Sequence, residues 1–107
     1  MSDEDGCKEM RTRFVRSFLD ITILHILSDE PSWGYRIMTD LKERFDVKVG
    51  PSVIYPLLDS MTKKGLVEVN DAYSGKRKRR TYSITPKGLE SIKCMRSVIA
   101  GLFEVDG

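Results

Sequence analysis

The stretch that decides the fold is residues 52–70, which read SVIYPLLDSMTKKGLVEVN. Its apolar residues follow the i, i+3, i+4, i+7 spacing of an amphipathic helix: Ile54, Leu57, Leu58 and Met61. This helix should run from Ser52, as N-cap, to about Lys64, and Gly65 is the stop that it needs. Residues 66–70 then alternate apolar and polar side chains, as a strand does. The stretch therefore predicts a helix that leads directly into a β-strand.

A second extended segment is expected at residues 81–84, where Tyr82 and Ile84 face one side. Residues 71–80 lie between the two segments and contain a Ser74-Gly75 turn. Together these segments predict a β-hairpin with a long basic tip.

Three more helices are expected around this unit. Residues 10–28 lack Gly and Pro and are apolar on two sides, so a helix there must be covered on both sides. Because so small a domain offers one core, the second face indicates a partner chain. A second helix should cover residues 33–45 with Ser32 as N-cap. The last helix should run to about Phe103, after Thr85 as N-cap and Pro86 at its first position.

The chain of 107 residues is long enough for one domain, and its 40% apolar and 32% charged residues are typical of a soluble globular protein. The acidic start excludes a signal peptide, no apolar run reaches the length of a membrane span, and the cytoplasm is the expected location. One His and two isolated cysteines give too few ligands for a structural metal site, and no cofactor is expected.

The order helix, helix, helix, hairpin, helix predicts a mainly α fold with a small β-hairpin wing. This is a winged helix-turn-helix followed by a C-terminal dimerisation helix. The expected divisions are a flexible leader over residues 1–9, the winged-helix DNA-binding domain over residues 10–84, and the dimerisation helix over residues 85–107. The dimer should be formed by apolar residues of the first and last helices: Phe14, Phe18, Leu19, Ile23, Ile92, Met95, Ile99, Leu102 and Phe103.

The third helix of a winged helix enters the major groove of DNA, and five consecutive bases, residues 76–80, lie at the wing. The expected DNA-contacting residues are Tyr35, Ser52, Tyr55, Pro56, Asp59, Lys63, Lys76, Arg77, Lys78, Arg79 and Arg80. Ser52 would hold a phosphate at the helix start, and Lys63 would reach one as a point charge. Asp59 would accept from a cytosine or pair with a base. Tyr55 is either a DNA contact or the edge of the core.

Three motifs resemble, in order and spacing, those of the PadR family of regulators over residues 14–88. They are Gly34-Tyr35-Arg36-Ile37, then Ile54-Tyr55-Pro56-Leu57-Leu58 with Gly65-Leu66-Val67, and finally the run from Arg79 to Gly88. The resemblance implies a homodimer that binds a palindromic operator, and repression that a small-molecule effector often relieves. Ser52 stands where the family usually has Gly, and a single C-terminal helix is typical of its short members.

Three other classes of protein were weighed. A winged helix that binds only proteins would not need five bases at its wing. A regulator of the MarR or ArsR type would share the fold, but the Tyr55-Pro56-Leu57-Leu58 run argues against it. An enzyme is not expected, because the sequence has no nucleophile with a base, no paired carboxylates on an inward face and no phosphate-cradling glycine loop.

Overall fold

The computed structural model describes residues 3–103, except for the side chains of residues 3–5 and 74. Over these residues the chain forms helices around one small antiparallel sheet, whose strand order is β1-β3-β2. The elements are α1 (Asp3–Ser17), α2 (Leu19–Asp29), β1 (Ser32–Trp33), α3 (Gly34–Phe45), α4 (Pro51–Lys63), β2 (Val67–Ser74), β3 (Arg77–Ile84) and α5 (Pro86–Phe103). This is the mainly helical fold with a β-hairpin wing that the sequence predicts.

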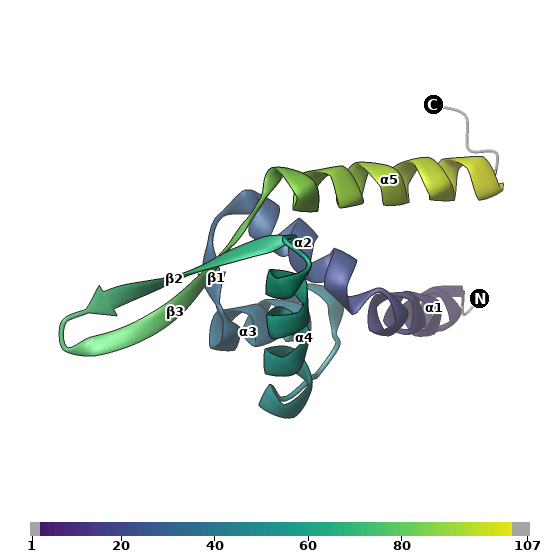
Figure 1. Ribbon diagram of the computed structural model, residues 1–107. Coiled ribbons are helices and arrows are strands. Elements are labelled where there is room, and N and C mark those ends of the chain that lie inside the picture. Colours follow the sequence, from purple (N-terminus) through teal and green to yellow (C-terminus); the bar gives the residue numbers. More distant parts are fainter. Residues whose placement is uncertain (1–2, 104–107) are drawn as a thin grey trace.

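The molecule is elongated. Its longest axis is 52 Å and its radius of gyration is 15.3 Å, whereas a compact domain of this length has about 13 Å. Figure 1 shows the cause: the β2–β3 hairpin projects from one side of the helical body, while α1 and α5 extend toward the other side. The two extensions leave much surface uncovered in a single chain.

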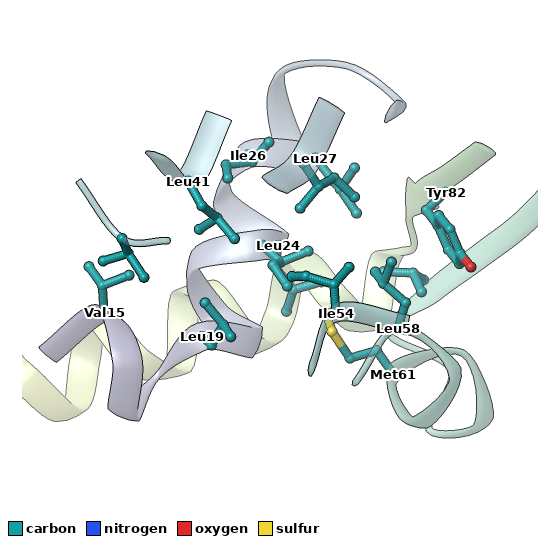
Figure 2. Packing of buried hydrophobic residues seen from close by; sticks show 14 of the residues in the cluster. Val15, Leu19, Leu24, Ile26, Leu27, Leu41, Ile54, Leu58, Met61 and Tyr82 are labelled. Atoms are coloured by element: carbon teal, nitrogen blue, oxygen red, sulfur yellow. The ribbon is translucent and has the colours of Figure 1, made fainter. Parts of the chain in front are cut away.

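The core lies where α2, α3 and α4 meet under the base of the hairpin. Figure 2 shows Leu24 of α2, Ile54 and Leu58 of α4, and Tyr82 of β3 converging there. Leu24, Ile54 and Leu58 are completely buried, and Tyr82 is 1% exposed. Burial of each such aliphatic side chain contributes about 1.5–3 kcal/mol, so this cluster fixes α4 against the body.

The first helical region is longer than expected and consists of two helices. Residues 3–9, expected as a flexible leader, belong to α1. The helix expected over residues 10–28 is interrupted at Phe18, whose φ of −120° and ψ of 48° are not helical. Lys8 of α1 also contacts Asp46, just after α3, at 3.1 Å. The apolar periodicity of residues 10–28 runs through Phe18 without interruption, so the sequence pattern gave no sign of the break.

Two expected N-caps are wrong. Ser32 lies in β1 and pairs with Tyr82 of β3, so α3 begins after Trp33 instead. Helix α4 begins after Gly50, with Pro51 at its first position and Ser52 inside its first turn. The expected stop of α4 is confirmed, because Gly65 adopts a left-handed φ of +78°.

The hairpin is longer and its turn shorter than the sequence suggested. Strands β2 and β3 pair from Val67↔Ile84 out to Ser74↔Arg77, so only Gly75 and Lys76 connect them. Gly75 takes a φ of +65°, as tight hairpin turns require. The basic run expected at a loose tip is therefore mostly strand, and the side chains of residues 77–80 each have a defined face.

Thr85 joins the hairpin to α5. Its hydroxyl lies 2.6 Å from the Gly65 carbonyl oxygen and 3.0 Å from that of Leu66, and it accepts a hydrogen bond from the Gly88 amide at 3.1 Å. The predicted N-cap is thus confirmed. Thr85 is also the only residue between β3 and α5.

Candidate nucleic-acid interface

The outward face of α4 carries the residues that the sequence assigned to it. All five are exposed: Ser52, Tyr55, Pro56, Asp59 and Lys63. Ser52 lies in the first turn, where backbone amides have no intrahelical partner, and Lys63 is the last residue of the helix. The two are about 16 Å apart along the helix axis, so they cannot contact the same phosphate.

Tyr55 connects α4 to α3. A β-carbon built on Gly34 would stand only 2.6 Å from the Cε1 and hydroxyl oxygen of Tyr55, so the ring packs directly on the Gly34 backbone. Tyr55 nevertheless remains 41% exposed. Its ring therefore serves as both core edge and exposed surface, the two roles between which the sequence could not decide. The neighbouring Tyr35 is 71% exposed and extends this surface onto α3.

The strand register divides the basic run between the two faces of the wing. Arg80 lies opposite Asp71 and shares a face with the core residue Tyr82, whereas Arg79, opposite Ala72, lies on the other face. Lys78 shares the Arg80 face, and Arg77 shares the Arg79 face. Four of the five bases in residues 76–80 are exposed, and Arg79 is half-buried.

Two acidic residues temper the charge on the Tyr82 face of the hairpin. Lys78 Nζ lies 3.1 Å from an Asp71 carboxylate oxygen, an ion pair that the sequence analysis missed. Near the base, burial raises the pKa of the Tyr82 hydroxyl, the neighbouring Arg80 acts in the opposite direction, and Asp59 of α4 adds to the rise. Arg77 and Arg79, in contrast, lie on the face without these acids.

Arg79 is half-buried because it stacks on Trp33. The guanidinium carbon lies 4.6 Å from the centroid of the Trp33 ring, a cation–π distance. Strand β1 makes this contact possible, since Trp33 pairs with Thr81 and thus lies beside β3. Trp33 was not among the interface residues expected from sequence, because a two-residue strand leaves no periodic signal.

The residues expected at the dimer surface fall into two groups. Leu19, Ile23 and Ile92 are buried in the core of the single chain, with 9%, 0% and 8% exposure, so assigning them to a dimer surface was wrong. Helix α2 packs against α1, α3, α5 and β3 of its own chain, and Leu19 and Ile23 are buried by that packing. The others keep exposed surface: Phe14, Phe18, Met95, Ile99, Leu102 and Phe103.

A groove of about 370 Å³ runs between α1, α2 and α5. Its apolar lining includes Phe14, Ile21, Phe45, Met95 and Ile99. Beyond it, Leu102 and Phe103 at the end of α5 are 71% and 72% exposed. Leu102 and Phe103 follow Ile99 by three and four residues and so share its side of α5. This helix extends away from the hairpin (Figure 1).

Over the part of the chain that the structure describes, no helix is long and apolar enough to cross a membrane. The same residues contain no cluster of His, Cys, Asp or Glu suited to a metal ion.

Solved structures share this fold over most of the chain. A PadR-like transcription factor from Bacteroides fragilis is 24% identical, with a TM-score of 0.76, and the match covers 90% of this chain and 93% of that one. A PadR family transcriptional regulator from Eggerthella lenta is 23% identical, with a TM-score of 0.72, and the match covers 97% of this chain and 91% of that one. A PadR-like transcriptional regulator from Bacillus cereus is 30% identical, with a TM-score of 0.68, and the match covers 88% of this chain and 99% of that one. The first two likenesses establish the fold.

The family is established by sequence. The model of the transcriptional regulator PadR-like family matches residues 23–93, which is more than half of the chain, whereas none of the curated proteins matches it. Members of this family are transcriptional regulators rather than enzymes, and this implies DNA-binding regulation. The chain therefore belongs to the PadR-like family of transcriptional regulators, and it has the winged-helix fold.

Proposed function

We propose that this protein is a homodimeric repressor that acts in the cytoplasm and binds a palindromic operator. In this proposal the α4 helix of each protomer lies in a major groove, and the β2–β3 hairpin contacts the adjacent backbone. Repression would follow from occupancy of the operator. Its relief by a small molecule stays a prediction of the family resemblance.

The observation that carries the DNA-binding part is the concentration of charge on the hairpin. The whole chain has a net charge of only +2, yet residues 76–80 are five consecutive bases, four of them on a strand that projects from the body. Like charges held this close repel one another in the free protein. A phosphate backbone relieves that repulsion, so a polyanion is the partner that best fits this strand.

The dimer is supported by the apolar groove and by the shape of the chain. Leu102 and Phe103 extend beyond the body on α5 with more than two thirds of their surface exposed. A second copy of α5 would cover them and close the groove along Ile99. Two protomers related by a two-fold axis read inverted half-sites, which is why the operator should be a palindrome.

The test is selection of bound sequences from random duplex DNA. Enrichment of an inverted repeat would support the proposal. Tyr55→Ala and Lys63→Ala should then weaken binding to the selected site while the fold persists, because both side chains are exposed on α4. Leu58→Ala should instead cost about 2–5 kcal/mol of stability, since Leu58 is completely buried.

Absence of any enriched sequence, together with binding that does not depend on salt, would contradict the proposal. The protein would then be better explained as a winged-helix module that binds other proteins.

A further inference from the structure

The Trp33 ring is placed beside the wing by the two-residue strand β1. Trp33 pairs with Thr81, and Arg79 lies two residues further along the same face of β3. Diagonal neighbours of this kind are within reach of an aromatic ring and a long side chain. The resulting stack, 4.6 Å from guanidinium carbon to ring centroid, ties the wing to the start of α3.

A second arginine, Arg36, also lies against the Trp33 ring, but it already forms an ion pair with Glu30. Arg36 is 5.7 Å from the Trp33 centroid, and its Nη2 lies 2.7 Å from a Glu30 carboxylate oxygen. Arg79, in contrast, has no carboxylate within ion-pair distance among the residues that the structure describes. Its charge is therefore available to an anion from outside the chain.

An open hollow lies next to this stack. The described residues that line it are Trp33, Tyr35, Arg77 and Arg79, and none of them is an acid. Two arginines and two aromatic residues thus line one space of about 400 Å³. Paired arginines suit a phosphate, because each presents several N–H donors in a fixed plane.

The hollow adjoins the surface of α4. Gly34, between Trp33 and Tyr35, is the residue on which the Tyr55 ring packs. A duplex lying along Tyr55 would therefore pass close to the hollow. An arginine immobilised on DNA loses rotamer freedom, and Arg79 has already given up part of that freedom on Trp33.

From this arrangement we propose that Trp33, Tyr35, Arg77 and Arg79 form a seat for one backbone phosphate of duplex DNA. Trp33 is a positioning residue in this seat, because its ring holds the Arg79 guanidinium in place. The proposal rests on the DNA-binding function proposed above and adds to it a defined contact at the base of the wing.

The sharpest test compares Arg79→Lys with Arg77→Lys. Both variants keep the charge, lie two residues apart on one strand face, and differ in that only Arg79 stacks on Trp33. Affinity for the selected duplex should fall roughly two- to fivefold further for Arg79→Lys than for Arg77→Lys, because an ammonium group cannot stack on the Trp33 ring as the planar guanidinium does. Equal losses would overturn the positioning role of Trp33.

A double-mutant cycle tests the same coupling from the ring side. Trp33→Leu should weaken DNA binding, Trp33→Phe should restore most of it, and Trp33→Leu combined with Arg79→Ala should be no weaker than Arg79→Ala alone. Losses that multiply, or wild-type binding by Trp33→Leu, would overturn the proposal. If Trp33→Leu fails to fold by circular dichroism, the lysine comparison decides.

The wild-type protein separates the two proposals. If it shows no salt-dependent binding to duplex DNA, the proposed function fails. If it binds and the two lysine variants lose affinity equally, only the positioning role of Trp33 fails.

Discussion

The ring of Tyr55 packs on the backbone of Gly34, so closely that a β-carbon at Gly34 would lie 2.6 Å from the Tyr55 hydroxyl oxygen. This contact sets the distance between α3 and α4 at the surface assigned to DNA. The Gly-Tyr start of α3 and the Tyr-Pro of α4, two motifs far apart in the sequence, are thus one packing unit. Glycine is needed at residue 34 for close approach rather than for backbone freedom.

We expect Gly34→Ala to displace the Tyr55 ring. Overpacking of this kind costs about 1–3 kcal/mol of stability, and the displaced ring should also weaken operator binding. Gly6→Ala is the matched control, because Gly6 is also helical and a β-carbon there meets nothing within 4 Å. Denaturant titration and operator affinity of both variants provide the measurement. Equal behaviour of the two would mean that Tyr55 moves aside without consequence.

The salt dependence of binding should report the wing arginines. Each phosphate contact that is lost lowers the slope of log affinity against log salt by about 0.9. Because a dimer carries two wings, Arg77→Ala with Arg79→Ala should lower the slope by up to about 4. Lys78→Ala is the comparison. Lys78 lies on the face opposite to Arg77 and Arg79 and already pairs with Asp71, so this variant should change the slope less. An unchanged slope in the double variant would make the basic run a solvated surface only.

Dimerisation should depend on the apolar stripe of α5. Ile99→Glu places a charge in the groove, and light scattering at micromolar concentration should then show a monomer with reduced operator affinity. Ser97→Glu adds the same charge to an exposed residue on the other side of the helix, and it should leave the dimer intact. A wild-type protein that is itself monomeric under these conditions would refute the architecture of the proposed dimer.

The Thr85 junction should be a sensitive point for stability. Thr85→Ala removes the N-cap of α5 and a hydroxyl partner of two carbonyl groups, at a cost of about 1–3 kcal/mol. Thr62→Ala makes the same chemical change within α4, where the hydroxyl bonds only to the Leu58 carbonyl four residues earlier. That variant should change stability by less than about 0.5 kcal/mol, because such back-bonding contributes little to a helix. Similar losses on thermal unfolding would deny Thr85 a special role.

Local patterns were enough to predict most of this fold. Three features depend on residues close together in sequence: the helical periodicity around Leu58, the stop at Gly65 and the cap at Thr85. The structure has each of them. The same holds for the division of Arg79 and Arg80 between two strand faces, which follows from alternation alone.

What local patterns could not show depends on contacts between distant segments. Strand β1 exists because Ser32 meets Tyr82 fifty residues later, and a two-residue pairing has no period to detect. The outer half of the hairpin was missed because its exposed residues show no apolar alternation. The second apolar face of residues 10–28 suggested a partner chain, and the structure leaves Phe14 and Phe18 exposed on it, so the partner stays a prediction.

The single residue between β3 and α5 has a mechanical consequence. The Thr85 hydroxyl donates to the Gly65 carbonyl and accepts from the Gly88 amide, and the Thr85 amide donates to the Leu66 carbonyl. The wing and the last helix are therefore joined rigidly, with no hinge between them. If two copies join through α5, the distance and the angle between their two wings are fixed. A dimer of this kind is sensitive to the rotational phase of the two half-sites as well as to their separation. One base pair inserted between the half-sites turns the second site by about a tenth of a helical turn. The wings cannot follow this rotation, because the junction at Thr85 is rigid.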